Sequence, residues 1–238
     1  MKKNFLIYLV AGVMISATSC KKLVEIAPQN SVTPEVALAD VDGYNALLIS
    51  VYDRMQAYGY YGRDMALMGD ALADNIYTVA AQAGNRYSGQ NLNTRSSHYG
   101  IWAAAYGAIN DLNNIIAGID ALPNVPTSKQ TLQKQVKAEA LALRGLAFFD
   151  IARIYGYEPN RIPTTGTGAG FNKSAVLRLV PTKLASDADL KPRSTVTEVY
   201  TQIEKDFLAS IAAFQSMALT TAPTHPFRVN ESAAHALL

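Results

Sequence analysis

Apolar side chains recur at helical spacing along most of this chain. Residues at i, i+3, i+4 and i+7 form stripes that are typical of amphipathic helices. These stripes occupy residues 44–55, 101–120 and 195–214. Residues 132–155 are apolar nearly all round from Leu141 onward, which predicts a helix in the middle of the fold. A fifth helix is expected at 231–238, capped by Asn230. The pattern predicts an all-α protein.

Capping residues and a proline stand where these helices are expected to begin and end. Asp40 or Asp42 stands before the first stripe, and either could cap it. Pro123 follows the second stripe and ends it. Thr195, with Glu198 three residues later, has the capping-box spacing. The boundaries therefore agree with the helices that the apolar period predicts.

Three charged residues interrupt the apolar helix at 132–155. Arg144, Asp150 and Arg153 could mark a binding site, but Asp150 and Arg153 are three residues apart and can pair on one helix face. A paired structural network is the favoured interpretation for charges on a buried helix. Asn113, inside the stripe at 101–120, likewise needs a partner if it is buried.

The segment 158–193 has few helical signals. Its GTGAG sequence, residues 166–170, lacks both the third glycine of a dinucleotide loop, where Phe171 stands, and the Gly-Lys-Ser of a P-loop. These glycines are interpreted as sites of flexibility. Residues 176–180 alternate apolar and polar side chains, which predicts a short strand that ends at Pro181.

The N-terminus has the order of an export signal. Two lysines precede an uncharged run at 5–17, which is too short to span a bilayer, and small residues then lead to Cys20, the single cysteine. This arrangement resembles a bacterial lipobox, so residues 1–19 are expected to be a lipoprotein signal peptide and Cys20 the lipidated residue of a tether at 20–34. The alternative is an ordinary signal peptide with an incidental cysteine.

Composition adds one exclusion. The chain has 238 residues with 21 Lys and Arg against 19 Asp and Glu, and residues 1–19 contain two of the lysines and no acid. The remainder is therefore balanced in charge, which argues against a nucleic-acid surface. An apolar content of 49% is enough for one sizeable core or two small ones.

Several stretches together carry a family resemblance. They are the lipobox at Cys20, IWAAAYGAINDLNNII (101–116), AEALALRGLAFFDIARIYG (138–156), PRSTVTEVYTQIEKDF (192–207) and RVNESAAHALL (228–238). In order and style they resemble the SusD-like, or RagB/SusD, outer-membrane lipoproteins. The resemblance implies a SusD-like α-helical fold with tetratricopeptide-type helix pairs and long irregular loops. Residues 35–238 would be its N-terminal helical domain, truncated at the C-terminus.

The resemblance also implies a function. Such a protein is a lipid-anchored, cell-surface glycan-binding protein of the outer membrane, which delivers oligosaccharides to a SusC-like TonB-dependent transporter without a cofactor. Lys21 and Lys22 depart from the acidic residues usual after the cysteine of surface-displayed relatives. Helical repeats alone leave an alternative open, a lipoprotein adaptor that binds protein partners in the envelope.

The best candidate for a sugar site is the polar segment 69–100. Its rings, amides and guanidinium suit a carbohydrate face. The candidate ligand residues are Tyr77, Arg86, Tyr87, Asn91 and Tyr99. Taken singly, Tyr77 and Tyr99 could instead be half-buried helix-edge residues and Arg86 a solvated one. Trp102 is expected in the core, and the YGYYG sequence at 58–62 is expected to be a turn with exposed rings.

The sequence gives little support to an enzyme. The sequence has three histidines, His98, His225 and His235, and none of them has a second metal ligand at a recognised spacing. A GxSxG motif is also absent. Asp187 and Asp189 are expected to be solvated in a loop. The chain is therefore expected to bind its ligand without catalysis and without a metal.

Overall fold

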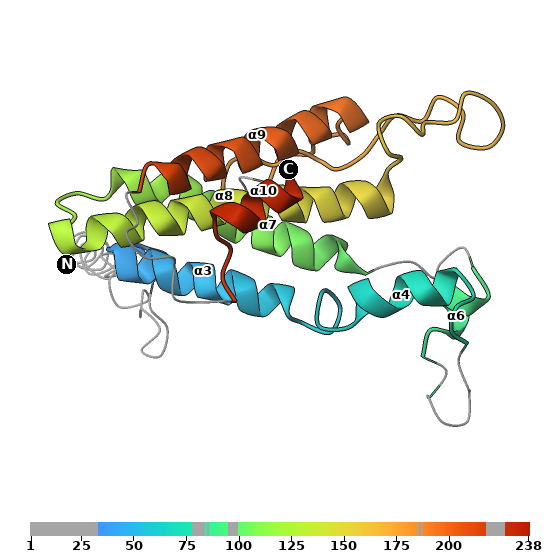
Figure 1. Ribbon diagram of the computed structural model, residues 1–238, viewed down its shortest axis with the longest axis horizontal. Coiled ribbons are helices and arrows are strands. Elements are labelled where there is room, and N and C mark those ends of the chain that lie inside the picture. Colours follow the sequence, from blue (N-terminus) through green and yellow to red (C-terminus); the bar gives the residue numbers. More distant parts are fainter. Residues whose placement is uncertain are drawn as a thin grey trace, which may run out of the picture. The chain divides into compact units, whose positions relative to one another are not determined.

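The computed structural model describes residues 33–77, 84, 86–94, 100–184, 186, 188–217 and 227–238. The chain divides into two units, 1–37 and 38–238, and the described part of the first contains the short helix α2 (Pro34–Ala37). The elements of the second unit are α3 (Val41–Met55), α4 (Asp64–Leu72), α6 (Ser88–Asn91), α7 (Ile101–Gly118), the 3-10 turn η2 (Ile119–Ala121), α8 (Thr127–Tyr155), α9 (Val196–Gln215) and α10 (Glu231–Leu237) (Figure 1). The predicted all-α class is confirmed.

Helix α8 lies at the centre of the second unit. It packs against α9 and α7 and also touches α3. Ala142, Phe148 and Ile151 are fully buried along it, as its nearly all-round apolar sequence predicts. A side chain at Gly145 would meet the Phe207 ring of α9 at 3.1 Å, so a small residue is needed for these two helices to approach.

The helix caps follow the sequence pattern closely. Asp40, rather than Asp42, caps α3, because its Oδ1 accepts the backbone N–H of Gly43 at 2.8 Å. Thr195 and Glu198 form the expected capping box at the start of α9. Asn230 caps α10. The first turn of α8 was not expected, since the structure places its start at residue 127 rather than 132.

The charges on α8 form the structural network that the spacing predicts. Arg144 donates to both carboxylate oxygens of Asp206 on α9, at 2.8 and 2.7 Å, and to Asn113 Oδ1 on α7 at 2.9 Å. Asp150 pairs with Arg153 at 2.8 Å. Asn113 also donates to the Arg178 carbonyl, so its buried amide has the partners it needs.

Glu139 adds a buried charge to the same helix. Tyr52 Oη of α3 donates to its carboxylate at 2.6 Å, and Arg228 Nε, which precedes α10, donates at 2.9 Å. Burial and the neighbouring Glu139 raise the pKa of Tyr52, so the phenol stays protonated and keeps donating. The long helix is thus tied by polar contacts to segments before and after it in the chain.

The predicted strand at 176–180 is wrong. Within the described residues the segment is extended but unpaired with another strand, and the one bridge, between Lys173 and Thr195, is isolated. Its backbone groups instead meet side chains of α7. Tyr106 Oη donates to the Val176 carbonyl at 2.9 Å, and Asn110 accepts from the Thr182 N–H at 2.7 Å. Side-chain contacts therefore replace a sheet partner.

The turn at 58–62 is only partly as expected. The side chains of Tyr58 and Tyr61 are exposed, but Tyr60 is fully buried and donates to Asp150 Oδ2 at 2.6 Å. Tyr61 donates to the same oxygen at 2.7 Å.

In the part of the chain that the structure describes, there is no helix with the length and apolar character needed to cross a membrane.

Candidate functional site

The structure places the sequence-predicted sugar residues unevenly. Tyr77 is 82% exposed, so the half-buried alternative does not hold for it. Arg86 is exposed in the turn before α6. Tyr99 and the lipidation candidate Cys20 lie outside the described residues. The described members of the predicted group therefore offer two exposed side chains, Tyr77 and Arg86.

Tyr87 and Asn91 fasten α6 to α4. Tyr87 Oη donates to Asp64 Oδ1 at 2.7 Å. Asn91 Nδ2 donates to the carbonyls of Ala71 and Ile76, at 3.1 and 2.5 Å. These contacts give the two residues a positioning role in the segment that carries the exposed side chains.

A ring and guanidinium stack stands at the start of α4. The guanidinium of Arg63 lies 5.5 Å from the Tyr58 ring centre and 5.8 Å from that of Tyr87. Arg63 Nε also donates to Asp64 at 2.7 Å. Burial acts to raise the pKa of Asp64, but hydrogen bonds from Arg63 and Tyr87 outweigh it and hold the pKa below its usual value.

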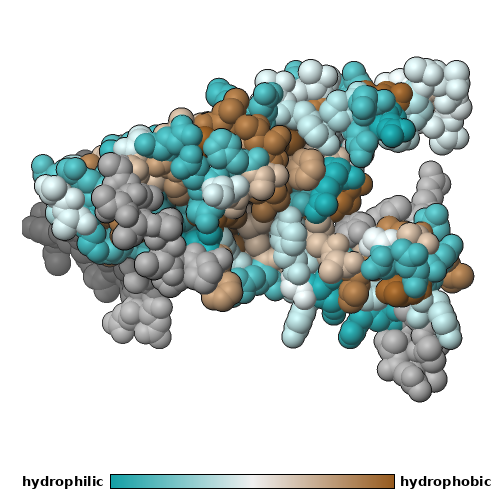
Figure 2. Space-filling model, viewed as in Figure 1, coloured by the Kyte–Doolittle hydropathy of each residue, from teal (hydrophilic) through white to brown (hydrophobic). Residues whose placement is uncertain are grey.

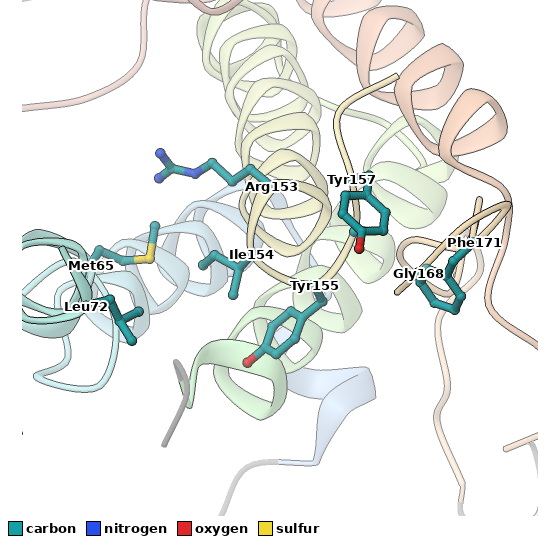
Figure 3. Close-up of a pocket in the computed structure, with 9 residues that line it drawn as sticks. Met65, Leu72, Arg153, Ile154, Tyr155, Tyr157, Gly168 and Phe171 are labelled. Atoms are coloured by element: carbon teal, nitrogen blue, oxygen red, sulfur yellow. The ribbon is translucent and has the colours of Figure 1, made fainter. Parts of the chain in front are cut away.

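A concave site lies at the C-terminal end of α8. Its volume is about 690 Å³, within the range of small-molecule sites. We call it the α8-end pocket, and it is lined by Met65, Leu72, Arg153, Ile154, Tyr155, Gly156, Tyr157, Gly168 and Phe171. Figure 3 shows the α4 residues on one side and Tyr157, Gly168 and Phe171 on the other. Figure 2 shows the surface hollowed between α4 and the loop of residues 157–171.

Glycines shape the loop that forms one wall of this pocket. Gly166, Gly168 and Gly170 have φ values of +75°, +85° and +70°, a region that favours glycine. A Cβ at Gly168 would come within 2.4 Å of Tyr157 Oη. The Gly170 N–H donates to the Pro163 carbonyl at 2.9 Å. The GTGAG glycines, interpreted from sequence as flexible, therefore also allow a specific turn that brings the loop against Tyr157.

Aromatic rings form one wall of the pocket, and Arg193, which is not among the lining residues, packs on one of them. The Phe171 side chain is 42% exposed, and its ring stands edge-on to Tyr157 with centres 6.4 Å apart. The Arg193 guanidinium lies 5.4 Å from the Phe171 ring centre. Ring faces of this kind suit the C–H faces of sugars, which are apolar while their hydroxyls remain polar.

Arg153 is held in a fixed position at this pocket. Its Nε and Nη2 donate to Asp150 Oδ1 at 3.1 and 2.8 Å, while Tyr60 and Tyr61 occupy the other oxygen. Burial acts to lower the pKa of Arg153, but Asp150 outweighs it, so the pKa is raised and the guanidinium stays charged. The described lining residues include the phenols of Tyr155 and Tyr157 and the guanidinium of Arg153, and no carboxylate, imidazole or thiol.

Of the lining residues, only Arg153 is a possible binding residue by its sequence pattern, and a structural pair with Asp150 is the interpretation favoured for it. Phe171 stands where the GTGAG sequence lacks a third glycine, which by itself does not indicate a ligand contact. The available signal was a cluster of rings, Tyr155, Tyr157 and Phe171, around a glycine-rich turn. Met65 and Leu72 carry no such signal, because only the fold brings α4 to the end of α8.

Trp102 joins two concave surfaces. It is half-buried and packs against the core, as expected, with its ring centre 4.9 Å from Tyr106 and 5.1 Å from Tyr155. It also lines a second pocket of about 380 Å³ between α7 and residues 176–182 and 190–191. The ring row of Tyr106, Trp102 and Tyr155 therefore connects this second pocket to the α8-end pocket.

The described residues offer no metal centre. Among them there is no group of three or more His, Cys, Asp or Glu side chains placed to hold an ion. His235 lies 3.6 Å from Glu231 one helical turn away, and His98 and His225 lie outside the described residues.

Known proteins share both the sequence pattern and the fold. The SusD-like protein P38 of Formosa agariphila is 27% identical over 206 residues, which cover 85% of this chain and 35% of that protein. A SusD-like carbohydrate binding protein from Bacteroides vulgatus aligns with a TM-score of 0.61 at 20% identity, over 82% of this chain and 40% of the other. A laminarin binding SusD-like protein aligns with a TM-score of 0.58 at 20% identity, over 83% and 39%.

These comparisons fix the family and the extent of the match. The two solved structures show the shared fold, and the chain spans about 35 to 40% of the length of these relatives. The SusD-like family model described as starch-binding and associating with the outer membrane matches residues 33–238. The chain therefore belongs to this SusD-like family.

Proposed function

We propose that this chain is the N-terminal part of a glycan-binding lipoprotein of the outer membrane, and that it captures oligosaccharides in the α8-end pocket. The SusD-like family match over residues 33–238 supports this function, as does the fold shared with carbohydrate-binding proteins. The bound oligosaccharide passes to a SusC-like TonB-dependent transporter.

One observation carries the location of the site. The α8-end pocket combines the rings of Tyr155, Tyr157 and Phe171 with the fixed guanidinium of Arg153. Rings stack on sugar faces, and a charged donor makes strong hydrogen bonds to hydroxyls. Tyr77 and Arg86 act as further contacts from the neighbouring segment, with Tyr87 and Asn91 holding that segment in place. Tyr99 is proposed as a contact from the sequence alone.

The location is tested by removing rings one at a time. Phe171→Ala and Tyr157→Ala should each weaken oligosaccharide binding about tenfold. Each substitution removes one ring contact to the sugar, and a contact of about 1.4 kcal/mol corresponds to a factor of ten in affinity. The measurement is isothermal titration calorimetry against laminari-oligosaccharides and malto-oligosaccharides. Phe227→Ala is the matched control, because that ring is 88% exposed and lines neither pocket.

The outcomes separate the two candidate regions. Unchanged affinity in both ring variants would rule out the α8-end pocket. A large loss in Tyr77→Ala with no loss in Phe171→Ala would move the site to the segment 69–100. Loss in Phe171→Ala and Tyr157→Ala, with the control unchanged, supports the pocket.

The membrane anchor is proposed from the lipobox at Cys20. Acyl chains on that thiol would hold the protein at the outer membrane, since each buried CH₂ adds about 0.8 kcal/mol of membrane affinity. Cys20→Ala should move the protein from the membrane fraction to the soluble fraction without a change in its circular dichroism spectrum. A variant that stays with the membranes would contradict the anchor.

The genes next to the one that encodes this chain can test the proposed transporter partner. A neighbouring gene for a large TonB-dependent barrel would support delivery to a transporter. Neighbouring genes for envelope assembly proteins would instead favour the adaptor function, in which the helices bind protein partners. Copurification of the barrel with the protein would then test the pairing directly.

A further inference from the structure

We propose that the second pocket, between α7 and residues 176–182 and 190–191, is a subsite for a negatively charged sugar unit. We call it the α7 hollow, and it is lined by Trp102, Tyr106, Asn110, Arg178, Thr182 and Lys191 among others. Its volume of about 380 Å³ lies at the small end of the range for ligand pockets. The proposal rests on the glycan-binding function and extends it to the charge of the ligand.

The frame of the α7 hollow is already formed by protein contacts. Tyr106 Oη both accepts the Val176 N–H at 2.6 Å and donates to the Val176 carbonyl at 2.9 Å. Asn110 makes the same two-way contact with Thr182, at 2.7 and 3.2 Å. Burial raises the pKa of Tyr106 to about 12, so the phenol remains a donor at neutral pH.

These contacts decide which groups remain for a ligand. The phenol of Tyr106 and the amides of Asn110 and Asn113 are engaged in holding residues 176–182. The charged side chains Arg178 and Lys191 have further donors, since an ammonium has three and a guanidinium five. Recognition in the hollow therefore depends on rings and cations rather than on amides.

Positive charge exceeds negative charge at this place. The described lining residues include Arg178 and Lys191 but no carboxylate. Both cations contact Asp189 at the edge, with Arg178 Nη1 at 3.0 Å from Asp189 Oδ1 and Lys191 Nζ at 3.6 Å from Asp189 Oδ2. Arg178 Nη2 also donates to the Asp189 backbone carbonyl. The Asp189 side chain is itself 58% exposed. An entering anion would therefore meet two cations that share a single, solvated carboxylate.

The two pockets are linked through one ring contact. Trp102 lines the α7 hollow and contacts Tyr155, which lines the α8-end pocket. A row of rings of this kind offers continuous apolar surface to a chain of sugar units. The ligand class is thus an oligosaccharide with a carboxylate, as in uronic acids, or a sulfate ester on the unit that reaches the hollow.

The test compares charged and neutral oligosaccharides on the purified full chain. The probes are oligogalacturonates for carboxylate, carrageenan oligosaccharides for sulfate, and laminari-oligosaccharides as neutral ligands. The double variant R178Q/K191Q should bind the charged probes at least tenfold more weakly and the neutral probes unchanged. Lys191→Gln alone, at a partly exposed side chain, should give a smaller loss of about threefold.

A matched variant controls for net charge. K134Q/K205Q removes two exposed lysines that line neither pocket, so its affinity for the charged probes should stay within about twofold of the wild type. Equal losses in both double variants would overturn the proposal, because the effect would then be general attraction. Selective loss in R178Q/K191Q supports it, and the probe that binds identifies carboxylate or sulfate.

The result also separates this proposal from the function on which it rests. Binding of neutral probes alone, with no affinity for either charged class, overturns the charged subsite and leaves the glycan-binding function standing. Failure of all three probe classes contradicts both. Binding of charged probes that depends on Phe171 but not on Arg178 and Lys191 overturns the subsite alone.

Discussion

Asp64 shows how one buried carboxylate organises an exposed surface. It accepts hydrogen bonds from Arg63 Nε and Tyr87 Oη, each at 2.7 Å, and so fixes the Tyr87 ring beside the Arg63 guanidinium. The residue is 6% exposed, and its pKa lies below the usual value despite the opposing effect of burial. The folded state therefore favours the charged carboxylate relative to the unfolded chain.

This shift predicts a pH dependence. Asp64→Asn should lower the free energy of unfolding at pH 7 by about 1 kcal/mol. Because the folded pKa is depressed, the contribution of Asp64 is full above the unfolded pKa of about 3.9 and is lost as the pH falls through the folded value. The difference between wild type and variant should therefore be constant from pH 7 to 5 and shrink below about pH 4. Urea unfolding at each pH measures it, with exposed Asp53→Asn as control.

A difference that grows toward low pH would show that Asp64 is not stabilised as the carboxylate.

The pairing of Asp150 with Arg153 could be predicted from the sequence, because residues three apart on a helix lie on the same face. Tyr60 and Tyr61 could not be predicted as the other partners, since they stand 90 and 89 residues away in the chain. Long-range partners of buried charges become visible only in the fold.

Helix α8 shows how an element is held by both apolar and polar contacts. Its buried face packs on α9 and α7, and Arg144 joins the three helices through Asp206 and Asn113. The Arg144 and Asp206 side chains are 8% and 2% exposed. Breaking a buried pair leaves an uncompensated charge, whereas replacing both partners with apolar groups can cost little.

This contrast gives a prediction for the α8 and α9 pair. Arg144→Met should lower the free energy of unfolding by about 3 to 5 kcal/mol, since Asp206 would keep only its contact from Gln202. The double variant R144M/D206L should be more stable than the single variant. Lys129→Met, which removes an exposed pair with Asp42, should cost less than about 1 kcal/mol. A double variant no more stable than the single one would contradict a buried ion pair.

Elements with long apolar stripes were predicted well, and those without them were not. The helices at 101–120 and 195–214 correspond to α7 with η2 and to α9. Helix α4 was missed, because nine residues are too few for a clear stripe and a polar segment follows. The strand at 176–180 was wrong because alternation predicts an extended chain but does not say whether a strand or helix side chains meet its backbone.

At the scale of the whole molecule, the candidate site depends on where the elements meet. The α8-end pocket gathers residues 65–72, 153–157 and 168–171, which are separated by long stretches of sequence. The family resemblance led to the fold and to a sugar-binding function, while the composition of the segment 69–100 placed the candidate residues there. The only lining residue in that segment is Leu72 among those the structure describes. The ring cluster around the glycine-rich turn is a local pattern, but the α4 wall of the pocket comes from a distant segment and could not be predicted.

The most direct test is to map an oligosaccharide onto the protein by nuclear magnetic resonance. Backbone amide shifts would be followed while the purified chain is titrated with the oligosaccharide that binds best. If the oligosaccharide binds in the α8-end pocket, the largest shifts should fall at residues 153–157 and 168–171 and in α4. Shifts confined to residues 86–94 or to α10, with the end of α8 unchanged, would contradict the α8-end pocket as the glycan site.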